Sequence, residues 1–134
     1  MHGNEVFTPE EVERIYQMKR ENYGIKKVEI LDGTIGYLQM NTFVHPHFAG
    51  ESMRAAMAFL AHTQALIIDL RANGGGEGLI GQFLCSYFFS AFEAEYIQLN
   101  GLYDRRQDLV RQYWVFPYVP ACKSQHYSAL PRFL

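Results

Sequence analysis

The residues best suited to chemistry lie in one short segment rich in glycine. Segment 73–78, with the sequence NGGGEG, follows the almost continuously apolar run Ala65–Leu70 and precedes a second apolar run that starts at Leu79. Glycine tolerates positive φ and lets another chain or a ligand approach the backbone closely. If a helix begins here, its first amides lack intrahelical partners and carry the positive end of the helix dipole. The segment is therefore predicted to offer backbone N–H donors to a negatively charged or polarised group.

One kind of site that this segment could form is a phosphate or dinucleotide cradle. Gly76, Gly78 and Gly81 match the G-x-G-x-x-G fingerprint. The first glycine of that fingerprint should directly follow a strand, whereas residues 71–75 intervene here. Glu77 would also place a negative charge beside the phosphate. These departures argue against a phosphate cradle.

Another kind of site is an oxyanion hole, in which backbone amides stabilise the charge that develops on a scissile carbonyl. A tight strand-to-helix turn without any ligand would use the same residues. The residues by themselves leave these two alternatives open.

Metal and redox sites are not indicated elsewhere in the sequence. His45 and His47 flank Pro46, but two histidines without a third ligand nearby are typical of an ordinary loop. Cys85 lies in an apolar run and Cys122 near the C-terminus, without a Cys-x-x-Cys pair. We expect these cysteines to be a buried small hydrophobe and a tail thiol. No metal ion or cofactor is therefore expected.

The composition indicates one folded domain without broad electrostatic attraction to nucleic acid or membranes. The chain has 134 residues, of which 49% are hydrophobic and 19% charged, and its formal net charge is -2. No long run of one charge sign occurs, and the apolar runs are shorter than the roughly 20 residues that a membrane helix needs. No signal peptide is visible. Neither a nucleic acid nor a membrane is expected as a partner.

The surrounding sequence predicts the elements that position the glycine segment. Thr8, Pro9 and Glu11 carry the signals of a capped helix start, and Asp32-Gly33 is a strong turn signal. In chain order we expect a helix over 9–23, strands 27–31 and 35–40, a loop 41–50, a helix 51–62, a strand 65–70, a helix 79–92, and strands 95–99 and 110–116. The apolar strand 65–70 should be buried on both faces. Strands and helices alternating around it predict an α/β layer fold.

The glycine segment in its context resembles the motif of a known enzyme family. Residues 69–76, DLRANGGG, are similar to the Asp-Leu-Arg-x-Asn-x-Gly-Gly motif of tail-specific (C-terminal processing) serine peptidases. That group includes the tricorn core and the interphotoreceptor retinoid-binding protein modules. Further segments resemble the retinoid-binding-like branch, so that the match covers residues 12–120: 20–24, 28–33, 35–38, 102–105 and 114–120.

The resemblance implies a fold and a set of residue roles. It implies an incomplete ClpP/crotonase-like fold of β-β-α layers with an N-terminal helix. It also implies peptide-bond cleavage by a serine, with the substrate held as an added strand. Gly75, with Gly74 beside it, would donate a backbone amide to the oxyanion. Asp69, Arg71 and Asn73 would brace the loop rather than perform chemistry.

The resemblance also indicates what the chain lacks. The family's nucleophile lies in a Thr-x-Ser-(Ala/Gly)-Ala-Glu-like segment beyond the position of Pro120. In residues 121–134 the pair Ser128-Ala129 is a faint echo of it, but no Glu follows and Pro131 would break a helix there. We therefore expect the chain to stop before the nucleophile, with Ser128 as a nominal candidate only.

These expectations divide the chain into a helical remnant (1–24), a partial peptidase domain (25–120) and an irregular tail (121–134). Two functions remain: an inactive fragment of a serine peptidase, or a non-catalytic module that binds an extended peptide or an apolar ligand with the same loop. The expected partner is a peptide or an unfolded protein C-terminus. A fold without its later strands should expose apolar surface and an unpaired strand edge, so self-association is expected too. The family is often extracytoplasmic, and the sequence leaves the compartment of this chain open.

Overall fold

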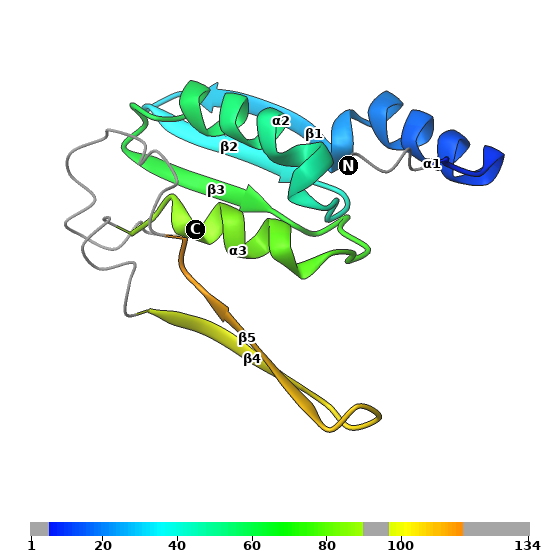
Figure 1. Cartoon of the computed structure of the whole chain (residues 1–134). Helices are drawn as coiled ribbons and strands as arrows, with labels where there is room; N and C mark the ends of the chain where they lie inside the picture. The colour runs from blue at the N-terminus through cyan, green and yellow to red at the C-terminus, as the bar shows by residue number, and fades with distance from the viewer. Residues whose placement is uncertain (1–5, 90–96, 117–134) are drawn as a thin grey trace, which may run out of the picture.

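The chain adopts a mixed α/β fold, which confirms the predicted fold class (Figure 1). The structure is a computed structural model and describes residues 6–89 and 97–116. Its elements in chain order are α1 (Pro9–Arg20), η1 (Asn22–Gly24), β1 (Ile25–Leu31), β2 (Ile35–Met40), α2 (Pro46–Phe59), β3 (Ala65–Asp69), α3 (Gly78–Ser86), β4 (Gln98–Asp104) and β5 (Leu109–Trp114).

The main sheet has three strands in the order β1-β2-β3. β1 and β2 form an antiparallel hairpin at the predicted Asp32-Gly33 turn, where Gly33 has a φ of 81°. β2 and β3 are parallel, with Leu38 opposite Ile68, and α2 makes the crossover between them. Because β2 and β3 run in the same direction, the segments that follow them leave the same end of the sheet.

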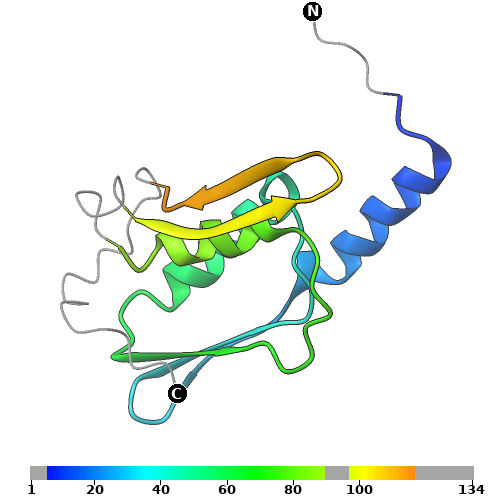
Figure 2. The same ribbon diagram turned by 90° about the horizontal axis from the view of Figure 1, so that it is seen from below.

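The core lies between the sheet and the helices α2 and α3, which cover the same face of it (Figure 2). Leu38 and Met40 of β2 alternate toward this face, and Met53 of α2 and Ile80 of α3 meet them. All four side chains are fully buried. Removal of this apolar surface from water is the main term that stabilises the fold.

Two elements extend beyond this core. Helix α1 begins with the predicted capping box, in which the Thr8 hydroxyl accepts from the Glu11 amide and the Glu11 carboxylate accepts from the Thr8 amide. No α1 residue is buried, and the helix points away from the sheet (Figure 2). The β4–β5 hairpin lies against α3, where Gln82 Nε2 donates to the Trp114 carbonyl and the Phe116 amide donates to Ser86 Oγ.

Four predicted elements differ clearly from the structure. Helix α3 ends at Ser86 rather than at residue 92, and residues 90–92 lie outside the described part. Helix α2 starts at Pro46 rather than at residue 51, because His45 serves as N-cap through its Nδ1 atom and Pro46 suits the first helical position. Strand β4 lies at 98–104 instead of 95–99, and residues 95 and 96 fall outside the described part. Strand β3 is predicted to be buried on both faces, but three of its five residues are only half-buried, and it forms an edge of the sheet that the described residues make.

The edge of β3 opposite β2 is relevant to the predicted self-association. Among residues 6–89 and 97–116, no strand pairs with β3 on the side opposite β2. Such an edge can accept a further strand, and self-association remains a prediction. The division at residues 24 and 120 also remains a prediction, since residues 117–134 lie outside the described part. None of the described helices is long and apolar enough to pass through a bilayer.

Candidate functional site

The glycine loop, residues 73–77, lies at the end of the sheet where β2 and β3 both stop. It connects β3 to α3 and runs beside segment 40–43, which follows β2. The Gly74 amide donates to the Asn41 carbonyl (3.1 Å), and the Phe43 amide donates to the Gly75 carbonyl (2.9 Å). These bonds continue the parallel pairing of β2 and β3 beyond the strands.

Gly76 makes the closest approach in this pairing. It forms an isolated parallel bridge with Phe43, in which the Glu77 amide donates to the Phe43 carbonyl (2.8 Å). Gly76 has a φ of 132°, and a Cβ placed on it would lie 2.1 Å from the Phe43 carbonyl oxygen. Only glycine fits at this position, because both the backbone conformation and the space exclude a side chain.

The Asn73 side chain forms hydrogen bonds both inside the loop and with segment 40–43. Its Nδ2 donates to the Met40 carbonyl (3.0 Å), and its Oδ1 accepts from the Gly75 amide (2.7 Å). The Thr42 hydroxyl donates to the Gly75 carbonyl (3.1 Å) from the neighbouring segment. Asn73 therefore replaces ladder hydrogen bonds at a place where the backbone has left the strand.

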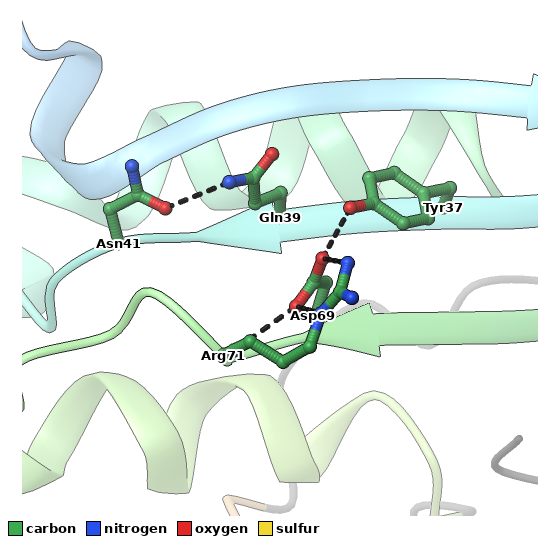
Figure 3. Close-up of polar contacts among 5 residues, drawn as sticks. All are labelled: Tyr37, Gln39, Asn41, Asp69 and Arg71. Atoms are coloured by element: carbon green, nitrogen blue, oxygen red, sulfur yellow. Dashed lines mark hydrogen bonds and ion pairs between the residues drawn. The ribbon is translucent and has the colours of Figure 1, made fainter.

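Asp69 and Arg71 form a second set of contacts, together with Tyr37 of β2 (Figure 3). The Arg71 guanidinium donates to both Asp69 oxygens, from Nε at 3.0 Å and from Nη2 at 2.8 Å, and the Arg71 amide donates at 3.0 Å. The Tyr37 hydroxyl donates to the same carboxylate at 2.5 Å. The Asp69 side chain is 7% exposed and that of Arg71 is 87% exposed, so the carboxylate is the buried member of the pair.

These contacts shift the ionisation of all three groups. The Arg71 guanidinium, followed by the Tyr37 hydroxyl and the Arg71 amide, holds the pKa of Asp69 well below its usual range. The Asp69 carboxylate in turn raises the pKa of Arg71, mainly through their hydrogen bonds. It also raises the pKa of Tyr37, whose hydroxyl proton it accepts. Asp69 is thus an ionised carboxylate that accepts hydrogen bonds from Arg71 and from Tyr37 of the neighbouring strand.

We predict that Asp69→Asn flattens the acid limb of the stability–pH curve. A carboxyl group whose folded pKa is depressed stabilises the fold above its unfolded pKa of about 4, and this contribution is lost as the pH falls toward the folded pKa. Thermal unfolding between about pH 2 and pH 6 should therefore show a steeper decline for the wild type than for Asp69→Asn. The exposed Asp32→Asn variant is the control and should keep the steep decline. Parallel curves for the wild type and Asp69→Asn would contradict this role.

The amides of the loop differ in their availability. Gly74 and Gly75, the residues predicted to donate to an oxyanion, both have their amides engaged, by Asn41 and Asn73 respectively. No described residue accepts a hydrogen bond from the amide of Gly76. Glu77 is the N-cap of α3 and accepts from the Leu79 amide (3.4 Å), which places its carboxylate at the helix N-terminus. That position favours a carbonyl oxygen over a phosphate as the group that the loop would meet.

The remaining candidates that the structure describes do not assemble around this loop. Ser128 and Cys122 lie outside the described residues. Within residues 6–89 and 97–116, no serine is hydrogen-bonded to a histidine or lysine, and the Ser86 hydroxyl donates to the Gln82 carbonyl instead. Burial raises the pKa of the Cys85 thiol, so it is a poor nucleophile. The described residues contain no cluster of three metal-ligating side chains.

Sequence reasoning did not identify Tyr37, Met40 and Phe43 as parts of this site. They lie about thirty positions before the loop and reach it only because β2 and β3 pair in parallel. The strand pairing could have indicated Tyr37, because it lies two residues before Gln39, the residue opposite Asp69, and a tyrosine on the same face can reach that carboxylate.

A comparison with protein families finds a match that includes the residues of this site. The sequence model described as Peptidase family S41 matches residues 34–109, which is more than half of the chain. The matched region starts at the β1–β2 turn, contains the glycine loop with its partner segment 40–43, and ends at the first residue of β5.

Proposed function

The chain belongs to peptidase family S41, and from this premise we propose that the glycine loop binds the backbone of an extended peptide, with the Gly76 amide donating to a peptide carbonyl. The observation that carries the proposal is the contrast between Gly76 and its neighbours. The loop is held on several sides by hydrogen bonds, and yet the amide of Gly76 has no described acceptor. A rigid backbone with one open donor is suited to polarise a carbonyl oxygen.

The proposal modifies the role expected for Gly74 and Gly75. The Gly75 amide could donate to a substrate only after Asn73 Oδ1 releases it, and the Gly74 amide only after the Asn41 carbonyl does so. Release of the Gly74 amide would break a bond between the loop and segment 40–43, and release of the Gly75 amide would break a bond inside the loop. Donation by Gly76 requires neither rearrangement, so we assign the contact to Gly76 and a supporting role to Asn73.

The edge of β3 that has no partner strand among residues 6–89 and 97–116 supports an extended peptide as the partner. An incoming strand pairs with such an edge through main-chain hydrogen bonds, without regard to most side chains. β3 leads through residues 70–72 into the glycine loop, so a peptide along this edge would bring its carbonyls toward the loop. An unfolded chain or a flexible protein C-terminus can adopt the extended conformation that this pairing needs.

The proposal further holds that the chain binds such a peptide without hydrolysing it. The described residues contain no serine activated by a base, and Ser128-Ala129 lacks the Glu that follows the nucleophile in the motif it echoes. Binding without turnover is the non-catalytic alternative that the sequence had left open. Membership of family S41 does not depend on whether this chain hydrolyses the peptide.

Backbone amide NMR tests the assignment of the donor. In a titration of the ¹⁵N-labelled chain with an unstructured peptide, the Gly76 amide proton should move downfield as it gains a hydrogen bond. The Gly74 and Gly75 amide protons should move little, because they already have acceptors. The Gly74→Ala variant should give the same response, since an added Cβ there meets no heavy atom within 4 Å. A response at Gly74 and Gly75 without one at Gly76 would contradict the assignment.

Turnover is checked in parallel with a fluorogenic casein substrate. The wild type and Ser128→Ala should release fluorescence at the same background rate. Hydrolysis by the wild type that disappears in Ser128→Ala would overturn the non-catalytic part of the proposal and leave the binding part standing.

A further inference from the structure

A cleft of about 320 Å³ lies between α3 and the β4–β5 hairpin. Its helical wall includes Gly78, Gly81 and Cys85, and its hairpin wall includes Leu99, Leu102 and Tyr113. The hairpin and α3 lie side by side in both views (Figures 1 and 2). The volume falls in the range of sites that bind small ligands or single side chains.

The two glycines of the helical wall have no explanation in the backbone or in packing. Neither has a positive φ, and a Cβ added to either would meet no heavy atom within 4 Å. Glycine inside a helix lowers its stability relative to alanine, because the unfolded chain loses more conformational freedom. These glycines leave their part of the helical wall without side chains that would project into the cleft.

The side chains that line the cleft indicate which kind of chemical group it can bind. None of the described lining residues carries a charge. Both amide side chains in the lining are engaged, since Gln82 Nε2 donates to the Trp114 carbonyl and Asn100 Oδ1 accepts from the Gly101 amide. A charged group would enter this cleft without compensation, whereas an aliphatic group would exchange water for apolar contact.

The lining of the cleft begins at Gly78, the residue that follows the glycine loop in the chain. Gly78 belongs to its lining and is only two residues beyond Gly76, whose amide is the proposed carbonyl donor. Two residues of chain span at most about 7 Å, which a side chain next to the bound carbonyl can bridge.

We propose that this cleft is the pocket for one uncharged aliphatic side chain of the bound peptide, of the size of leucine or methionine. The proposal rests on the proposed function, because the loop supplies the backbone contact and the cleft supplies the choice of side chain. It assigns Gly78 and Gly81 to specificity and the hairpin to the outer wall of the pocket.

The test uses a panel of unstructured peptides that differ at one position, where they carry Leu, Ala, Asp or Lys. Fluorescence anisotropy with the full chain should show the Leu peptide binding at least about tenfold more tightly than the others. In Gly81→Leu the cleft is filled, and the Leu and Ala peptides should bind within about twofold of one another. Gly81→Leu should unfold at a higher temperature than the wild type, which shows that the lost preference is not a loss of folding.

Gly50→Ala is the matched control, because Gly50 is also a helical glycine with open space at its Cβ position but lies in α2. It should leave the preference for Leu intact. As a second measurement in a Cys122→Ser background, the Leu peptide should slow alkylation of Cys85, which lines the cleft.

The outcomes separate the inference from the proposed function. Equal binding of all four peptides, unaffected by Gly81→Leu, would overturn the pocket and leave peptide binding by the loop in place. Absence of binding by every peptide would overturn the proposed function and the pocket with it. A change of molar mass in light scattering caused by Gly81→Leu, with no change in peptide preference, would instead assign the cleft to contact between copies of the chain.

Discussion

Gly76→Ala should destabilise the protein by about 2–4 kcal/mol, which is a large part of the total stability of a small domain. Two causes act together. The φ of 132° at Gly76 is one that side chains rarely adopt, and the new Cβ would lie 2.1 Å from the Phe43 carbonyl oxygen. The loop would have to leave segment 40–43 and break the hydrogen bonds on either side of the bridge. Urea unfolding followed by circular dichroism measures the loss.

The neighbouring glycines provide matched controls for the same chemical change. Gly74→Ala meets no heavy atom and needs no positive φ, so the stability should change by no more than about 0.5 kcal/mol. Gly75→Ala also meets no heavy atom, but its φ is 94°, and a loss of about 1–2 kcal/mol is expected. The predicted loss of stability therefore increases from Gly74→Ala through Gly75→Ala to Gly76→Ala. Equal midpoints for Gly74→Ala and Gly76→Ala would contradict the contact with Phe43.

Leu38→Ala should cost about 3–4 kcal/mol. Leu38 is 0% exposed in the central strand of the three-stranded sheet, and its side chain belongs to the cluster that joins β2 to α2 and α3. Its truncation removes apolar contacts and leaves a cavity. The cavity cannot close, because β2 is paired with a strand on each side. The midpoint of urea unfolding should fall without a large change in slope.

The control for Leu38 is Leu109→Ala, the same substitution at a residue that is 46% exposed at the start of β5. The expected loss there is below about 1 kcal/mol. A comparable loss for both variants would mean that the hairpin contributes to the core as much as β2 does. That result would contradict the layer arrangement described above.

Gly76→Ala and Leu38→Ala should also affect peptide binding, because both disturb β2 or the segment that follows it. Segment 40–43 contacts the loop through hydrogen bonds of Met40, Asn41 and Phe43. The position of the Gly76 amide therefore depends on β2 as much as on the glycines themselves. Loss of stability at either site should be accompanied by loss of peptide binding.

Local rules in the sequence were sufficient for much of the fold. The capping box of Thr8 and Glu11, the turn at Asp32-Gly33 and the passage from an apolar strand through glycines into a helix depend on residues a few positions apart. The family was also accessible, because its motif lies in one continuous run of residues 69–76. The start of α2 was missed, since histidine is a weak N-cap signal and Gly50 argues locally against a helix.

Other features depend on segments that meet only in three dimensions. β3 looked central because its residues are apolar, whereas its position at the edge of the described sheet follows from which strands pair. The sequence itself determined that a glycine loop would follow β3 and begin a helix, because glycine and helix preferences act on neighbouring residues. Only the tertiary structure decided which glycine is indispensable and which amide is open. Both depend on Phe43, Asn41 and Met40 approaching from another strand, and no local preference encodes that approach.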